Sequence, residues 1–398
     1  MLNPVNILEY VLTFFFLYAT VFFMLIALKH KDDLTKKPIL GTQRPKISVI
    51  IPAYNEEKTI RDSVLSVLNS NYPKEKLEII VIDDGSKDKT YEVANQIKDK
   101  RLIVLTKPNS GKAASINYAI DRSSGEIIAT LDADSFVTPN AIITMIPYFD
   151  EDNVAAVTAA VKVKNNGKAN LLKEMQRLEY IFIIFTRKIL NYVDSVPVTP
   201  GPLSMFKREI FDKIGKFDEK NIMEDQEIAL RIQSHNYKIR SSIDAEVYTQ
   251  VPENFAELLK QRVRWHRGGL RNNIKYMHMI SPSYGDFGVM MMPMTFIAIL
   301  ALIGVFFISF TYYASDSFYY YQKLGLDALL FSFSPLHFIV WTLFLINLAW
   351  IAWGMTLFKK EKISIPQVFI YMIGYFYLVT IYWIVALFKE LRGQKLTW

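Results

Sequence analysis

Four long apolar stretches flank a more polar middle region, and they constrain the fold more than any other feature of the chain. They run over residues 10–28, 287–313, 335–358 and 366–388. Each is long enough for a helix to cross the apolar core of a bilayer, which takes about 20 residues. The 398 residues are 51% hydrophobic but also 21% charged, too apolar for an ordinary soluble domain and too charged for a protein wholly within a membrane. The sequence therefore predicts a soluble domain attached to an α-helical transmembrane region.

The distribution of basic residues predicts how these stretches are oriented. No basic residue precedes the first stretch, and four lysines follow it: Lys29, Lys31, Lys36 and Lys37. Because positive residues concentrate on the cytoplasmic side, we expect the amino terminus outside and residues up to about 286 in the cytosol. Alternating passes then place 314–334 outside and Lys359, Lys360 and Lys362 inside. The same alternation places the basic carboxy-terminal tail outside, which the positive-inside rule does not prefer. Two alternatives therefore stay open: the last segment is re-entrant, or one of the longer stretches contains a bend.

Charge and cysteine content exclude several classes of protein. Lys and Arg exceed Asp and Glu by seven, which suits contact with anionic lipid headgroups or with a diphosphate substrate. The basic residues are scattered and form no nucleic-acid motif, so no nucleic-acid partner is expected. The chain has no cysteine, which excludes disulfides, thiolate metal sites and a cysteine nucleophile.

The polar region alternates short β-rich runs with segments of helical period. The runs lie at 46–51, 77–82, 102–105, 127–131 and 155–163. Such alternation is typical of βαβ units, so we expect an α/β fold with a mostly parallel sheet and helices on both faces. An open α/β sheet binds its ligand beyond the carboxyl ends of the strands. The acidic motifs described next fall at those ends.

Asp83 and Asp84 end the second predicted strand, where they could accept hydrogen bonds from a base imide and a ribose hydroxyl. Asp132 and Asp134 end the fourth, two residues apart, as suits a hard divalent ion that also binds diphosphate oxygens. Lys112 follows a Gly-containing turn and opens a helix, so it could contact phosphate. Taken singly, each motif is more often ordinary turn or cap chemistry.

Two further segments carry chemistry on predicted helices. Glu224 and Asp225 lie in the first turn of a helix, where the helix dipole favours acids, although one of them could instead be a general base. Residues 253–276 form a helical pattern with Phe255, Leu259, Val263 and Leu270 on one side and Gln261, Arg264, Trp265 and Gly268 on the other. If the apolar side is buried, Arg264 can bind a diphosphate and Trp265 can stack on a sugar ring. A third segment, 171–189, is amphipathic and basic, and fits a membrane interface or a core helix about equally.

The order and spacing of these motifs resemble family 2 inverting glycosyltransferases, especially the membrane synthases of hyaluronan, chitin, cellulose and poly-N-acetylglucosamine. The motifs are Asp83-Asp84-Gly85-Ser86, Asp132-Ala133-Asp134, Gly201-Pro202-Leu203, Glu224-Asp225 and Gln261-Arg262-Val263-Arg264-Trp265. The resemblance covers about residues 46–271. Met223 stands where the family usually has Thr or Ser before the acidic pair, and both acids are present.

The resemblance implies a GT-A fold and a role for each matching residue. It places the nucleoside at Pro52, Ala53, Tyr54, Asn55, Glu56 and Asp83, with Lys112 and Asp132 assisting. It implies that Asp134 binds Mg²⁺ or Mn²⁺ on the diphosphate, with Asp132 beside it, and that Asp225 is the catalytic base next to Glu224. Gly201 and Pro202 would line the acceptor site. Gln261, Arg264 and Trp265 would form the signature motif at the end of the site facing the pore.

The expected organisation follows. It comprises a transmembrane anchor (1–29), a basic linker (30–45), a cytosolic GT-A domain (46–252), interface helices (253–285) and a carboxy-terminal membrane region (286–398). We expect a multi-pass plasma-membrane enzyme that transfers sugar from a nucleotide-sugar, by default a UDP-sugar, to a growing polysaccharide, with coupled translocation. Transfer of one sugar to a lipid carrier or glycolipid is the alternative, and a non-catalytic sensor is a weaker one. Partners would be the donor, a saccharide or lipid-linked acceptor and the bilayer, with a homo-oligomer or an accessory membrane subunit left open.

Overall fold

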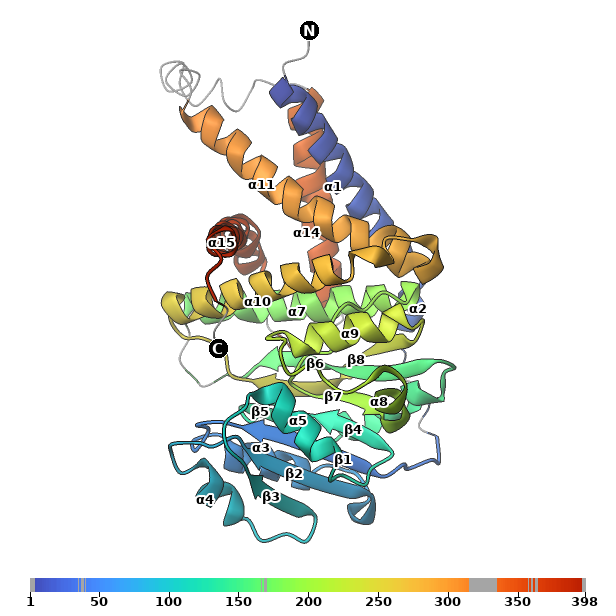
Figure 1. Cartoon of the computed structure of the whole chain (residues 1–398). Helices are drawn as coiled ribbons and strands as arrows, with labels where there is room; N and C mark the ends of the chain where they lie inside the picture. The colour runs from blue at the N-terminus through green and yellow to red at the C-terminus, as the bar shows by residue number, and fades with distance from the viewer. Residues whose placement is uncertain are drawn as a thin grey trace.

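The computed structural model describes residues 4–395, except 35, 37–38, 40, 166, 168–169, 315–334, 357, 359–360 and 362–363. The predicted external loop at 315–334 and the basic residues Lys37, Lys359, Lys360 and Lys362 lie outside the described residues. Within them, an α/β domain carries a layer of two long helices, and a set of apolar helices extends from that layer (Figure 1).

One eight-stranded sheet forms the centre of the α/β domain. Its strands are β1 (Ile47–Ala53), β2 (Leu77–Asp83), β3 (Leu102–Thr106), β4 (Ile127–Thr130), β5 (Ser135–Val137), β6 (Val154–Val163), β7 (Ser204–Lys207) and β8 (Lys238–Thr249). Their order in the sheet is β3-β2-β1-β4-β7-β6-β8-β5. The strands of β3-β2-β1-β4 are parallel, and so are β6 and β8. β7 is antiparallel to β4 and β6, and β5 to β8.

The predicted fold class is thus confirmed, and the five predicted strands are present. The sheet is mixed because β7 reverses the chain direction at its middle. β5, β7 and β8 were not predicted from the sequence, since two of them are only three or four residues long and β8 interleaves charged residues among its apolar ones.

Helices cover both faces of the sheet, as predicted. α3 (Ile60–Leu68), α4 (Thr90–Asn95) and α6 (Ala141–Met145) cover one face, and α5 (Lys112–Ile120), α8 (Arg208–Ile214) and α9 (Glu224–Ser234) cover the other. Successive residues of a strand point to opposite faces, so Val49 and Ile51 of β1 pack in the first layer while Ile50 packs in the second. The two cores leave the carboxyl ends of β1 and β4 free to build a site.

Two long helices lie between the sheet and the apolar helices (Figure 1). They are α7 (Leu171–Leu190) and α10 (Phe255–Lys275). α7 packs on β6 and β8 on one side and on apolar helices on the other, where Phe185 contacts Trp350 with ring centroids 5.0 Å apart. The amphipathic segment at 171–189 is therefore covered on both sides by protein.

The apolar helices are α1 (Pro4–Lys29), α11 (Met292–Ala314), α14 (Pro335–Thr356) and α15 (Ile365–Leu391). By length and composition, three stretches of the described residues could cross a membrane: Tyr10–Lys29, Phe287–Gly304 and Pro366–Leu391. The apolar part of α14 that is described, Thr342–Thr356, is shorter. Figure 1 shows α1, α11 and α14 running away from the sheet, while α15 is seen nearly along its axis beside α10. The last predicted segment thus runs in a different direction from the other three.

Candidate active site

A single cleft of about 1170 Å³ lies above the carboxyl ends of β1 and β4 and continues to the apolar helices. Fourteen of the residues expected at the site line it: Ala53, Tyr54, Glu56, Asp84, Lys112, Asp132, Asp134, Gly201, Pro202, Glu224, Asp225, Gln261, Arg264 and Trp265. Asn55 and Asp83, which were also expected there, do not line it. Asp83 is buried, and its carboxylate accepts hydrogen bonds from the Ser86 amide (3.2 Å) and the Thr106 hydroxyl (2.8 Å).

Lys112 joins two motifs that lie more than 90 residues apart in the sequence. Its Nζ lies 2.6 Å from Oδ1 of Asp132 and 3.2 Å from Oε1 of Glu224. These carboxylates and that of Asp225 raise the pKa of Lys112 although burial opposes this, so the ammonium stays charged. Gly201 packs directly on this group, and a Cβ at Gly201 would collide with the Asp132 carboxylate and with Lys112 Nζ. Gly201 therefore lies against the Lys112–Asp132 pair.

A tight turn before α5 presents Lys112 to the cleft. Gly111 has φ +95°, a conformation that other residues adopt only with strain. Asp84 fixes the turn by accepting hydrogen bonds from the backbone N–H groups of Ser110 (3.0 Å) and Gly111 (2.8 Å) and an ion pair from Lys107. In this structure Asp84 thus supports the turn that positions Lys112, while also lining the cleft.

The end of the cleft beside Tyr54 is built from two loops tied together. Asn55 has φ +57°; its amide donates to the Ser86 hydroxyl (2.9 Å), and its side-chain oxygen accepts from the Lys87 amide (2.8 Å). The loop that follows β1 is thereby held beside the loop that follows β2. Between them Tyr54 is 43% exposed, which leaves its ring available for contact with a ligand.

Asp134 lies in a concentration of negative charge. Burial, followed by the charges of Asp132 and Glu56, raises its pKa to about 7. The Ser135 and Thr249 hydroxyls lie 3.2 and 3.4 Å from its Oδ1. The described residues contain no cluster of three or more His, Cys, Asp or Glu side chains that could hold a metal alone. A pair of carboxylates nevertheless fits Mg²⁺ or Mn²⁺ when the substrate supplies phosphate oxygens, because Mg²⁺ is often bound by one or two carboxylates plus phosphates.

The acidic pair at 224–225 opens α9 and points into the same cleft. Burial, followed by the charge of Glu224, raises the pKa of Asp225 to about 7. Its Oδ1 accepts from the Gln226 amide (2.8 Å), and its backbone carbonyl accepts from the Thr199 amide (3.2 Å) and hydroxyl (2.8 Å). These last two bonds hold the loop that leads into Gly201 beside Asp225. A carboxylate that titrates near neutral pH can act as a proton acceptor.

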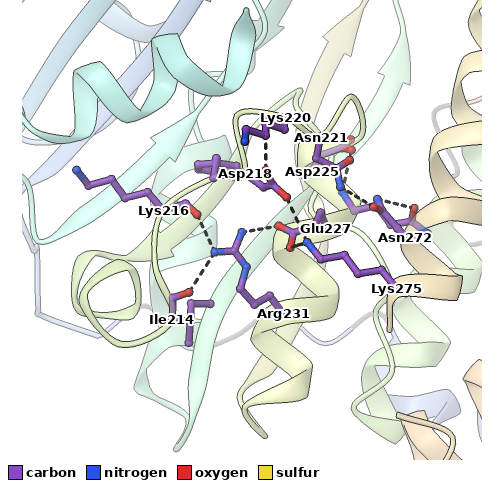
Figure 2. A network of polar contacts seen from close by, with 12 residues as sticks. Ile214, Lys216, Asp218, Lys220, Asn221, Asp225, Glu227, Arg231, Asn272 and Lys275 are labelled. Atoms are coloured by element: carbon purple, nitrogen blue, oxygen red, sulfur yellow. Dashed lines mark hydrogen bonds and ion pairs between the residues drawn. The ribbon is translucent and has the colours of Figure 1, made fainter. Parts of the chain in front are cut away.

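A polar network locks α9 to α10 (Figure 2). Glu227 is buried, and it accepts hydrogen bonds from the Tyr276 hydroxyl (2.7 Å) and Lys275 Nζ (3.0 Å) and pairs with Arg231. Asn272 Nδ2 donates to the carbonyl of Met223 (3.1 Å). The first turn of α9 and the helix that carries Gln261, Arg264 and Trp265 are therefore held in one arrangement.

The helical-wheel prediction for α10 was wrong in part. Phe255, expected to be buried, is 44% exposed, whereas Gly268, expected on the open side, is buried against Met223. The reason is that polar contacts decide which side of α10 is buried. Arg262 is 2% exposed; it donates to Glu179 of α7 (2.5 Å), and its guanidinium lies 4.1 Å from the Trp265 ring centroid.

The end of the cleft beside the apolar helices was not predicted from the sequence. It is lined by Thr295 and Ile299 of α11, Tyr371, Tyr375, Val379 and Trp383 of α15, and Glu179 and Arg187 of α7. His266, to which the sequence analysis assigns no role, stacks on Trp383 with ring centroids 4.5 Å apart, and burial lowers its pKa to about 4. α15 is also joined to α10 through Glu390, which pairs with Arg267 (2.9 Å) and Arg271 (2.5 Å). The aromatic spacing in α15 alone does not distinguish a lipid-facing position from a cleft-facing one.

Comparison with known proteins agrees with this geometry. Residues 48–215 match the family described as Glycosyl transferase family 2. The chain is 31% identical over 241 residues to the probable glycosyltransferase YdaM of Bacillus subtilis (strain 168), covering 58% of this chain and 57% of that protein. It is 33% identical over 242 residues to a poly-beta-1,6-N-acetyl-D-glucosamine synthase of Staphylococcus aureus (strain COL), covering 60% and 58%. The chain thus spans a little over half the length of the curated relatives it matches.

A solved structure shares the fold over nearly the whole chain. It is the mannosyltransferase PcManGT from Pyrobaculum calidifontis in complex with GDP-Man and Mn²⁺, with TM-score 0.64, 20% identity, and coverage of 98% of this chain and 100% of that one. At that identity the likeness shows the fold alone. Residues 48–215 thus match a glycosyltransferase family 2 domain, and the chain has the same overall fold as that solved mannosyltransferase.

Proposed function

We propose that the protein transfers a sugar from a UDP-sugar to a growing polysaccharide at the cytosolic face of the plasma membrane, with inversion at the anomeric carbon. The observation that carries the proposal is the bridge made by Lys112 between Asp132 and Glu224 in one cleft. It brings the donor-phosphate motif next to the acidic pair that would accept a proton. The similarity to a poly-beta-1,6-N-acetyl-D-glucosamine synthase makes UDP-N-acetylglucosamine the first donor to test.

The mechanism assigns a separate task to each end of the cleft. Asp225 takes the proton of the acceptor hydroxyl as its oxygen attacks the anomeric carbon, and the nucleoside diphosphate leaves from the opposite face. Lys112 and Arg264 stabilise the negative charge of that leaving group. Asp132 and Asp134 would hold Mg²⁺ or Mn²⁺, which neutralises diphosphate charge when bound. Tyr54 and the loop at Asn55 hold the nucleoside.

The continuity of the cleft with the membrane helices supports coupled translocation. The polymer would leave past Trp265 and the aromatic residues of α15, which offer flat faces for sugar rings. The same opening favours a second candidate function, the transfer of a single sugar to a lipid carrier, because α11 and α15 bring apolar surface to the site. In either case the membrane anchors of the enzyme would be residues 1–29 and 286–398. A linker at 30–45 would join the first anchor to the cytosolic domain, and the helices of 253–285 would lie at the membrane interface.

Product size separates these functions. Purified protein in lipid would receive Mg²⁺ or Mn²⁺ and labelled UDP-sugars, singly and in pairs, with Asp225→Asn as the inactive control. A long saccharide made only by the unmodified protein supports the polymerase. A single sugar on an organic-soluble acceptor supports the second function. Release of no nucleoside diphosphate from any donor, with the protein folded, would refute both.

A further inference from the structure

Gln226, the residue after Asp225, carries a side-chain amide that is held by the protein at its oxygen only. The residue is half-buried in the first turn of α9 and lines the cleft. Its Oε1 accepts a hydrogen bond from Nδ2 of Asn272 on α10 (3.3 Å). Its Nε2 donates to no residue that the structure describes, and this nitrogen is not closed off from solvent.

The backbone of Met223 determines how this amide is oriented. The Met223 N–H donates to Oδ1 of Asn221 (2.9 Å), so Nδ2 of Asn221 is the atom that donates to Oδ1 of Asn272 (2.7 Å; Figure 2). Nδ2 of Asn272 then donates to the Met223 carbonyl (3.1 Å) and to Oε1 of Gln226. Because a backbone N–H only donates and a carbonyl only accepts, the three side-chain amides have one consistent arrangement. That arrangement leaves the NH₂ group of Gln226 as the end available to a ligand.

The part of α10 that faces Gln226 carries no side chain. A Cβ at Gly269 would lie 3.2 Å from Oε1 of Gln226 and 3.8 Å from Nε2, so the amide lies directly over this glycine. Gly269 lines the cleft four residues after Trp265, on the same side of the helix and about 6 Å farther along its axis. A sugar ring that stacks on Trp265 would therefore lie within reach of the Gln226 amide.

The amide and the neighbouring carboxylate have complementary hydrogen-bonding capacities. The backbone N–H of Gln226 donates to Oδ1 of Asp225 (2.8 Å), which keeps the two residues together at the start of α9. An ionised carboxylate only accepts hydrogen bonds, whereas an amide NH₂ group donates them. Side by side, the two groups can accept from one sugar hydroxyl and donate to the oxygen of another. An amide is uncharged, so it suits a hydroxyl oxygen better than a phosphate, for which Arg and Lys are the usual partners.

We propose that Gln226 binds the acceptor by donating a hydrogen bond from Nε2 to a hydroxyl oxygen of its terminal sugar. The inference rests on the proposed function, and it names the acceptor as an uncharged saccharide. Asp225 accepts the proton of the attacking hydroxyl, and Gln226 holds a second oxygen of the same sugar, so that the attacking oxygen faces the donor. The donor itself is bound at the other end of the cleft, beyond Lys112.

The test uses the full-length protein in lipid nanodiscs with Gln226→Met, which keeps the length of the side chain and removes the donor. Asn272 keeps its hydrogen bond to the Met223 carbonyl, so the melting temperature should change little. The matched control is Gln233→Met on the same helix. Gln233 is buried, lies outside the cleft lining and donates to the Val196 carbonyl (2.6 Å), so this substitution should lower the melting temperature.

Calorimetry measures acceptor binding without turnover, and the probe is a soluble N-acetylglucosamine oligosaccharide. Gln226→Met should weaken its binding roughly two- to tenfold, as for loss of a hydrogen bond between uncharged groups. The same variant should leave the dissociation constant of UDP-N-acetylglucosamine unchanged, and also the release of UDP in the absence of an acceptor. Gln233→Met should leave the affinities for both ligands unchanged.

Several results would overturn the proposal. They are oligosaccharide binding by Gln226→Met that equals that of the unmodified protein, an equal fall in donor affinity, or a fall in melting temperature as large as that of Gln233→Met. Absence of oligosaccharide binding by the unmodified protein would overturn it too, as would a dependence on Gln226 of binding to a polyprenyl phosphate in the nanodisc instead. UDP release without an acceptor tests the proposed function separately, so failure of one is distinguishable from failure of the other.

Discussion

Replacing Gly201 with alanine should reduce activity without unfolding the protein. A Cβ at this position would lie 2.5 Å from Nζ of Lys112 and 2.6 Å from Oδ1 of Asp132, whereas ordinary contacts of a Cβ begin at about 3.4 Å. Both side chains would have to move by about 0.9 Å. They are the flexible ends of their residues, and Gly201 has no positive φ, so the move costs the fold little.

The displacement would open the 2.6 Å Lys112–Asp132 contact. A charge-assisted hydrogen bond contributes about 1.5–3 kcal/mol, which corresponds to roughly a ten- to 150-fold change in an equilibrium or rate constant. We therefore expect Gly201→Ala to lower kcat/KM for the donor by that factor, with a melting temperature close to that of the unmodified protein.

The assay is the rate of nucleoside diphosphate release at several donor concentrations, together with thermal unfolding. Gly41→Ala is the matched control, because its Cβ would meet only Asp150 Oδ2 at an ordinary 3.5 Å. Unchanged kinetics for Gly201→Ala would refute the view that the glycine protects the Lys112–Asp132 pair. A large fall in melting temperature would show instead that the position is structural.

Three further predictions follow from the same geometry. Asp225→Asn should lower kcat by about 10²- to 10⁴-fold with donor affinity retained, as isothermal titration can measure. Because the pKa of Asp225 is raised to about 7, kcat should rise with pH up to about 7 and then level off. The free energy of unfolding should fall as the pH rises from about 4 to 7, since the folded state still binds the proton of Asp225 and the unfolded state does not. Asp225→Asn should remove both pH dependences. Tyr276→Phe removes a 2.7 Å hydrogen bond to buried Glu227 and should cost about 1.5–3 kcal/mol in urea unfolding, while Tyr91→Phe on α4 should not.

Much of the fold and the donor end of the site could be predicted because their signals are local. Parallel strands end at one edge of a sheet, so Asp84 and Asp134 could be expected near each other. The clustering of 14 expected residues in one cleft agrees with that expectation, although their individual roles remain predictions. Asp83 differs because its oxygens are used by Ser86 in its own turn and by Thr106 at the end of β3.

The rest could not be predicted because it depends on how distant segments pack. Arg187 and Glu179 are two charged residues on a helix that by pattern alone suits a membrane interface and a core helix about equally. They become buried only because α7 is enclosed between the sheet and the apolar helices. In the same way the sequence analysis assigned a role to Arg264 and none to Arg262. A helical wheel shows only which residues share a side of the helix, and it contains no information about Glu179 as a partner of Arg262.

The contacts of α10 on its two sides link the apolar helix α15 to the turn that carries Asp225. Glu390 fastens α15 to Arg267 and Arg271, and Glu227 and Asn272 fasten α9 to the same helix. A tilt of α15 would therefore pull on the turn that carries Asp225. If α15 spans the bilayer as proposed, a mismatch in bilayer thickness that changes its tilt would reach the active-site turn. Lipid thickness would then alter the rate of the proposed transfer even with every residue of the cleft intact.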